Sequence, residues 1–562
     1  MLRLILSPSV GGTAGYLYDT AASIASSGGE AVLIVPEQYS FAAERIVLER
    51  LGTADAQRVE VLSFTRLANT VFNAVGWDKG KRLNEAGKIL LMSRALEQCA
   101  DKLNVYSRSA DSPAVVRELL SLNEEFCQCA ISPEDMTAAM NNMEDGLLKS
   151  KLADISLVFS VYDSFVSKGW LDDSRMLTRL KDKILESGYF KNKTVFFDSF
   201  RGFTAQEFGV IGKILTQADD VYAALTAPDL VERDSDDIFY HTKNTAKKLI
   251  KLANSVGVPC AKPVVINDPN GDPALDAFAS DFLSPEADVF SGACDSISIV
   301  ASPDIRSECA YAAAHIKRML RTGEYRSRDI AVIVRDETSY IRPMLTALAK
   351  CGVPVFEDRR QPVINQPLMT LVRAALKIAD TGFDTDSVLR ALKTGLCPLA
   401  ADEISDIENY TYLWQINGSG WLKKWESSPD GFGEMTENAA AELERLNALR
   451  EKAVEPFAKF RGKLKDNDGE GCAKAVFELL CELDTAQRLK DLAIYLEDSG
   501  ENVLALETER LWDTLCSLLD VAAQTLGKTP VKASRFSRLF DLMLSTVTLG
   551  EIPHSLEEVT IG

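Results

Sequence analysis

The sequence predicts an α/β fold with two parallel-sheet domains, each interrupted by an all-helical insertion. Three observations lead to this class. Short apolar runs alternate with helical patterns near the N-terminus, the apolar period changes to 3.6 residues between about 77 and 189, and both patterns recur after residue 296. Strand, loop and helix repeated with short connections indicate parallel strands joined by right-handed crossovers.

The first domain is expected to be divided by the first insertion. Residues 1–76 form its N-terminal segment, 77–189 the helical insertion, and 190–295 its C-terminal segment together with a linker. Pro, Asp and Gly are frequent from residue 264 onward, which indicates the linker. Buried strands are expected at 2–6, 31–35, 59–62, 194–197 and 221–225.

The second domain is expected over residues 296–380, with its first strand at 297–301. A second helical insertion then covers 381–546, and 547–562 begin a return to the sheet. This domain is therefore expected to be incomplete within the chain. Trp414, Trp421 and Trp425 surround a Gly-Ser-Gly segment; core packing is the expected role, and base stacking is the alternative.

Composition limits the classes of function. The formal net charge of −20 argues against a protein that coats nucleic acid, so DNA would need a local groove or a basic partner. No run reaches the roughly 18 apolar residues of a membrane span, and the N-terminal run is interpreted as a strand and not a signal peptide, so we expect a cytoplasmic protein without membrane contact.

Metal binding is not expected from the cysteines and histidines. The eleven cysteines are scattered, and the one close pair, Cys127 and Cys129, has no His or second pair nearby. His315 likewise lacks a companion ligand. Reduced thiols and a structural or surface histidine are the expected roles.

The chain is organised around the apolar run 194–197, which ends in Asp198. Helicase-type ATPases place their magnesium-binding carboxylate at the end of such a strand, and a glutamate that polarises the attacking water follows it. Here Ser199 follows, and a serine hydroxyl is not a base near neutral pH. The frame of a hydrolytic motif is thus present without its catalytic group.

A Gly-rich segment after the first strand is the candidate phosphate site. Gly11, Gly12 and Thr13 lie between a strand and a helix expected from about Tyr16. Thr13 stands where a phosphate loop carries its lysine. A vestigial nucleotide loop and a plain turn both remain open. Weak ATP binding, with Asp198 as the vestigial metal-side residue, is the most that we expect.

Two further loops should emerge at the same sheet edge, after strands 31–35 and 59–62. They carry Gln38, Ser40, Phe64 and Arg66, which supply the amide, hydroxyl, ring and guanidinium groups used to hold a single strand. The alternative is helix capping, because Ser40 and Thr65 precede expected helices.

The layout and several segments resemble known proteins. Two interrupted parallel-sheet domains are typical of the RecA-like domains of superfamily 1 helicases. More specifically, the chain resembles the AddB family, the B subunits of bacterial AddAB ATP-dependent helicase–nucleases, over nearly its whole length. The segments that carry this resemblance are 33–38, 62–68, 197–207, 325–335, 365–368 and 407–410.

The resemblance implies a degenerate motor that binds unwound DNA and reads the recombination signal Chi in double-strand break repair. Single- and double-stranded DNA and an AddA-type motor subunit would be its partners. Chi contacts would fall on Gln38, Ser40, Phe64 and Arg66, with Phe200 or Phe203 from the loop after Asp198. Asn69 departs from the aromatic residue that the family often has there.

The family's nuclease domain, with its iron–sulfur cysteines and magnesium site, would lie beyond Gly562. No catalytic residue, metal site or cofactor is therefore expected within this chain, apart from the weak ATP binding above. Two alternatives remain open: a working superfamily 1 motor ATPase, which needs the lysine and glutamate replaced by Thr13 and Ser199, and an interaction scaffold without DNA contact, which the net charge favours.

Overall fold

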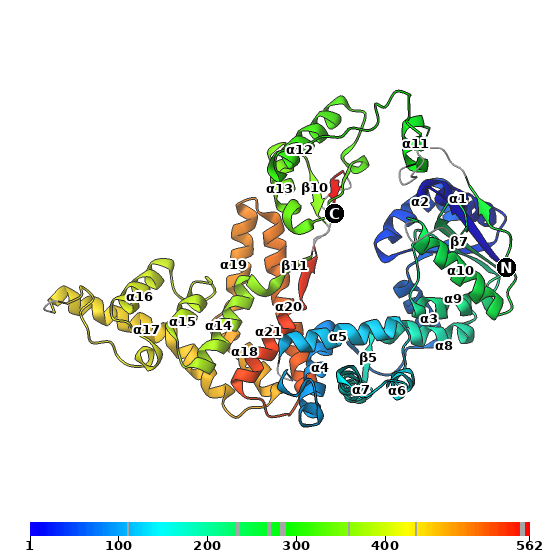
Figure 1. The fold of residues 1–562 in the computed structure, drawn as a ribbon. Coiled ribbons are helices and arrows are strands. Elements are labelled where there is room, and N and C mark those ends of the chain that lie inside the picture. Colours follow the sequence, from blue (N-terminus) through cyan, green and yellow to red (C-terminus); the bar gives the residue numbers. More distant parts are fainter. Residues whose placement is uncertain are drawn as a thin grey trace. The chain divides into compact units, whose positions relative to one another are not determined.

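The computed structural model describes residues 1–109, 112–231, 237–266, 271–281, 288–357, 360–432, 435–550 and 557–562. The chain divides into two compact units (Figure 1). The first comprises Met1–Arg82, Cys99–Ser109 and Arg117–Ile299, and the second Leu83–Gln98, Ala110–Val116 and Val300–Gly562. The domain boundaries expected from the sequence remain predictions.

The first unit contains a six-stranded parallel sheet in the order β3-β2-β6-β7-β1-β8. Neighbouring residues along a strand pack into different cores: Leu33 and Phe196 into one, Ile34 and Phe197 into the other. Burial on both faces explains why these strands are continuous apolar runs. The strands are β1 (Leu2–Ser7), β2 (Glu30–Ile34), β3 (Val59–Leu62), β6 (Lys193–Phe197), β7 (Asp220–Thr226) and β8 (Val264–Val265).

Helices cover both faces of this sheet. One face packs against α1 (Val10–Ser26) and α2 (Ser40–Ala56). The other packs against α3 (Phe64–Val75), α8 (Met176–Ser187), α9 (Ala205–Gln217) and α10 (Tyr240–Ser255). Helix α3 shows how the sequence sets such an element: Ser63 caps its N-terminus, and buried apolar residues recur three and four positions apart.

The segment between β3 and β6 is mainly helical, as the change of period predicts. It contains α5 (Pro113–Gln128), α6 (Pro133–Asn141) and α7 (Leu147–Val166), and a small sheet of β4 (Lys81–Leu83) and β5 (Trp170–Asp172). Buried Asp154 on α7 accepts backbone N–H bonds from Asn104, Val105 and Tyr106. These bonds fix the course of an irregular segment against the helix.

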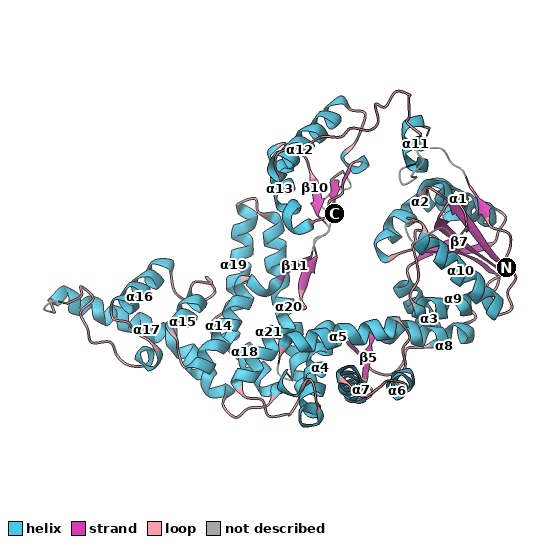
Figure 2. Cartoon of the chain, in the orientation of Figure 1, coloured by secondary structure: helices cyan, strands magenta, loops and turns pink. Residues whose placement is uncertain are grey.

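The second unit combines a small parallel sheet with many helices (Figure 2). The sheet has the order β10-β13-β9, from β9 (Ala331–Val332), β10 (Val355–Glu357) and β13 (Val559–Ile561), and packs on α12 (Ile305–Thr322) and α13 (Glu337–Lys350). A separate antiparallel pair joins β11 (Arg360–Pro362) to β12 (Thr548–Gly550).

Most of the remaining helices of this unit lie within the helical region expected over residues 381–546, whereas Glu85–Cys99 comes from the region expected over 77–189 and Pro367–Thr381 begins before residue 381. The remaining helices are α4 (Glu85–Cys99), α14 (Pro367–Thr381), α15 (Thr385–Leu392), α16 (Ala401–Leu413), α17 (Glu437–Leu464), α18 (Gly469–Glu482), α19 (Thr485–Asp498), α20 (Asn502–Leu526) and α21 (Ala533–Leu544). Parallel sheets with helical insertions confirm the predicted α/β class of RecA-like domains.

Two predicted elements are wrong. Residues 297–301 are not a strand: they make no ladder with the described residues, and Ile299 is 95% exposed. Their β-branched side chains favour a strand, but strand formation needs a neighbour with which to pair. Conversely, Val264–Val265 is not linker, because it adds strand β8 to the edge of the large sheet, and α11 (Pro273–Asp281) follows.

Candidate nucleotide and nucleic-acid site

Asp198 lies at the carboxyl end of β6, at the edge where a parallel sheet binds its ligands. Its side chain is 1% exposed. Oδ1 accepts the Ser199 N–H at 2.8 Å, whereas Oδ2 is buried without a hydrogen-bond partner among the described residues. Burial raises the pKa of this carboxyl from 3.8 to about 6, against the lowering effect of the Ser199 N–H bond.

Two tyrosines and a strained serine surround this carboxyl. Burial and the charge of Asp198 together raise the pKa of both Tyr18, on α1, and Tyr39, in the short helix η1 (Glu37–Tyr39). Ser199 has a φ of 64°, a left-handed conformation that costs energy for a residue other than glycine. No sequence signal identified the tyrosines, because their proximity to Asp198 arises only from the packing of α1 and η1.

The Gly-rich segment does not form a phosphate-wrapping loop. Only Pro8 and Ser9 connect β1 to α1, and the Ser9 N–H donates to Ser7 Oγ at 3.2 Å. Helix α1 begins at Val10 rather than near Tyr16, so Gly11, Gly12 and Thr13 are helical. Thr13 is 2% exposed. Among the described groups of this segment, the N-terminus of α1 is the remaining phosphate-binding feature.

The structure brings together the three phenylalanines expected at the DNA site. Phe64 and Phe200 have ring centroids 5.8 Å apart, Phe200 and Phe203 4.8 Å, and Phe64 and Phe203 6.4 Å. Phe64 is only 7% exposed and belongs to the core under the sheet, because the first turn of α3 directs it inward. Phe64 is therefore a core residue as well as a residue of the sheet edge.

The polar residues of this set lie in different surroundings. Gln38 is exposed in η1. Ser40 is buried, begins α2 and donates its hydroxyl to the Glu37 carbonyl at 2.7 Å, so it is committed to local structure. Arg66 is exposed on α3 and forms an ion pair with Glu44 on α2. Ser63, and not Thr65, caps the N-terminus of α3, because its side chain accepts the Arg66 N–H.

A cavity of about 450 Å³ opens at this edge, and we call it the edge cavity. Phe64 and Phe200 line it, whereas Gln38, Ser40, Arg66 and Phe203 do not. Its described lining contains no lysine or arginine but includes four carboxylates, from Glu37, Glu124, Asp173 and Glu207. Such a cavity disfavours a phosphate inside it and accommodates uncharged groups such as bases better.

The segment after Phe203 performs a structural task that sequence reasoning did not assign. Thr204 and Glu207 form a capping box at the start of α9, in which Thr204 N–H donates to Glu207 at 2.7 Å. Gln206 is 7% exposed and donates to the Ser174 carbonyl at 3.0 Å and to Thr178 Oγ1 at 2.9 Å. It thus ties α9 to the end of the helical insertion.

The three tryptophans considered from the sequence have structural roles. Trp421 and Trp425 are 0% and 3% exposed, which confirms core packing, and Trp414 donates to the Ser428 carbonyl at 3.0 Å. Within the described part of the chain, no group of three or more His, Cys, Asp or Glu residues has a metal-binding arrangement. None of the described helices combines the length and apolar character needed to cross a membrane.

Comparison with known proteins identifies relatives of the whole chain. Residues 9–277 match the family described as ADDB, N-terminal. The chain is 28% identical over 579 residues to the B subunit of the ATP-dependent helicase/deoxyribonuclease of Clostridium acetobutylicum, covering 100% of this chain and 50% of that protein. The protein of the same name from Ruminiclostridium cellulolyticum is 30% identical over 553 residues, covering 95% and 48%. The chain thus spans about half the length of these curated relatives.

Proposed function

We propose, on the premise that this chain belongs to the AddB family, that it is a DNA-binding and scaffolding component of a helicase–nuclease which processes double-strand breaks for recombinational repair. In this proposal it holds single-stranded DNA, including the Chi signal, and does not hydrolyse ATP. An AddA-type subunit supplies translocation, and the complex works in the cytoplasm.

The observation that carries the proposal is the altered sheet edge. A hydrolysing relative needs a lysine on the γ-phosphate and a glutamate on the attacking water. Here the lysine position, Thr13, is buried within α1, and the glutamate position, Ser199, directs its N–H back to Asp198. Beside these positions, Phe64 and Phe200 line the edge cavity, and their aromatic rings can stack with the bases of a nucleic acid.

The acidic lining suggests how the strand would lie. Four carboxylates repel phosphates, so the backbone would run outside the edge cavity while bases enter toward the phenylalanines. Arg66 lies on the exposed surface and offers a guanidinium to such a backbone, if a phosphate displaces Glu44.

The test is binding of single strands with and without Chi by the chain assembled with an AddA-type subunit, at two salt concentrations. Phe200→Ala should weaken binding, and Phe208→Ala is the matched control, because Phe208 contacts Phe203 but does not line the edge cavity. Equal affinities for wild type and the Phe200 variant would contradict this site.

A scaffold without DNA contact is the second candidate. The same four carboxylates and the net charge of −20 favour it. Under this function the complex would assemble normally, and no variant at the sheet edge would change its affinity for DNA.

A further inference from the structure

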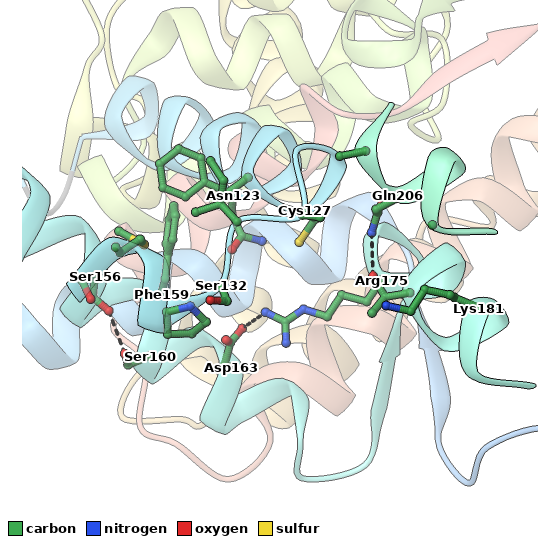
Figure 3. Close-up of a pocket in the computed structure, with 18 residues that line it drawn as sticks. Asn123, Cys127, Ser132, Ser156, Phe159, Ser160, Asp163, Arg175, Lys181 and Gln206 are labelled. Carbon is green, nitrogen blue, oxygen red and sulfur yellow. Dashed lines mark hydrogen bonds and ion pairs between the residues drawn. The ribbon is translucent and has the colours of Figure 1, made fainter. Parts of the chain in front are cut away.

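A second cavity, of about 370 Å³, lies among helices α5, α6, α7, α8 and α9 (Figure 3). We call it the insertion cavity. Gln206 lines both this cavity and the edge cavity, and its two hydrogen bonds hold it between them. A strand that reaches the edge cavity would therefore pass beside the insertion cavity.

Asn123 is the first observation that points to a ligand. It is 3% exposed, and its Nδ2 has no hydrogen-bond partner in the described part of the chain. Figure 3 shows its amide directed into the space bounded by Cys127, Ser132 and Arg175. A fold rarely keeps a buried donor without an acceptor, and an occupant that accepts this N–H explains it.

Two cations occupy the opposite side. Arg175 forms an ion pair with Asp163 on α7. Lys181 on α8 has no ion pair among the described residues. Its stem lies along α9 at Gly209, where a Cβ atom would be only 3.1 Å from Lys181 Cδ. The missing side chain at Gly209 thus leaves room for the lysine at the cavity.

The third wall is apolar and aromatic. Phe126 and Phe159 meet edge to face with centroids 5.8 Å apart. Ile131, Pro133 and Met136 extend this wall. A flat apolar body is the natural occupant of such a surface, and bases stack on aromatic side chains whatever their sequence.

We propose that the insertion cavity holds one nucleotide, with its base against Phe126 and Phe159 and its phosphate toward Lys181. This inference rests partly on the proposed function, since a bound strand would supply the nucleotide; a free nucleotide is the other source. Asn123 Nδ2 and the Lys181 ammonium, which have no partner among the described residues, are both donors, whereas the Arg175 guanidinium is already paired with Asp163. Thymine presents O4, an acceptor, where cytosine presents N4–H₂, a donor, so thymine is preferred over cytosine beside Asn123 Nδ2.

Cys127 gives a local readout of occupancy. It lines the cavity, whereas Cys129, two residues further on, is exposed and does not. Burial raises the pKa of the Cys127 thiol. Alkylation at alkaline pH, followed by peptide mass spectrometry, should show that dTMP and oligothymidylate slow modification of Cys127 and leave Cys129 unchanged. dCMP should protect Cys127 less than dTMP.

Three variants of the full chain complete the test. Asn123→Leu should weaken dTMP binding about fivefold, as expected for one lost hydrogen bond, without lowering thermal stability, because the lost donor is unpartnered. Ser156→Trp, on the lining face of α7, should fill the cavity and abolish protection. Ser164→Trp is the matched control on the same helix, because Ser164 is exposed and does not line the cavity.

The outcomes separate this inference from the proposed function. If oligothymidylate binds all variants equally and Cys127 reacts at an unchanged rate, the cavity holds no nucleotide, although DNA binding stands. If dTMP protects Cys127 but single strands do not bind, the site takes free nucleotides and the proposed DNA function fails. A loss of stability in Asn123→Leu with no change in protection would show that Asn123 is structural and would overturn the inference.

Discussion

Neutralising Asp198 should make the protein more stable above neutral pH. The carboxyl is 1% exposed, and burial raises its pKa from 3.8 to about 6. A pKa raised by folding means that protonation favours the folded state, so this stabilisation is complete below pH 3.8 and is lost as the pH rises through 6. The difference of about two pKa units corresponds to about 3 kcal/mol between the two limits.

Asp198→Asn keeps the shape and removes the charge. Its amide oxygen still accepts the Ser199 N–H, and its amide nitrogen takes the place of Oδ2 beside the Tyr18 hydroxyl, which has no partner among the described residues and can accept from it. At pH 8 the variant should exceed wild type by about 2 kcal/mol, somewhat less than the limit because local relaxation reduces the cost of the buried charge. Near pH 5, where the folded carboxyl is largely protonated but the unfolded one is already ionised, the difference should be about half as large, and it should vanish below pH 3.8.

Calorimetric unfolding of wild type and variant between pH 5 and 8 measures this difference. Asp219→Asn is the matched control, because Asp219 is exposed beside β7 of the same sheet, and its profile should follow wild type. Parallel pH profiles for wild type and Asp198→Asn would refute the reasoning, since they would mean that the carboxyl is ionised at little cost and is not buried as the structure has it.

Three further results are expected at the same edge. The chain, with or without single-stranded DNA, should show no ATP turnover near ~1 s⁻¹ in a coupled assay, because Thr13 and Ser199 replace the required groups; steady turnover would contradict this. Phe64→Ala should lower the free energy of unfolding, measured by urea denaturation, by about 3 kcal/mol, because Phe64 is buried. Phe200 is partly exposed, so Phe200→Ala should mainly weaken the free energy of single-strand binding, by about 1–3 kcal/mol. Arg66→Ala should change stability by less than about 1 kcal/mol, because its ion pair is exposed, and should flatten the salt dependence of strand binding measured by fluorescence anisotropy.

The sequence predicted most of the first sheet because its strands carry a strong local signal. Residues such as Leu33 and Ile34 are buried on opposite faces, so each strand is a continuous apolar run. Edge elements carry a weaker signal. Strand β8 has only two residues, and its pairing with β1 cannot be recognised from the composition of Val264–Val265. The exposed segment 297–301 has strand-forming residues and no ladder with the described residues.

The candidate site was predictable in its residue types and less so in their geometry. The positions of Asp198 and the phenylalanines follow from strand ends, which share one edge in a parallel sheet. The start of α1 at Val10 did not follow, because glycines at 11 and 12 favour a loop, whereas the structure leaves only two residues between β1 and α1. The inward direction of Phe64 likewise depends on where α3 begins.

Asn123 shows most clearly what sequence patterns miss. On α5 it occupies a position that periodicity assigns to a buried face, where an asparagine is either a satisfied polar residue or a ligand contact. The two cases differ only in whether another helix supplies an acceptor, and the described neighbours do not supply one for Nδ2. Gln206, in the first turn of α9, lies between this amide and the edge cavity. It lines both the edge cavity and the insertion cavity. Loss of Gln206 would therefore disturb both sites together, whereas loss of Asn123 would affect only one.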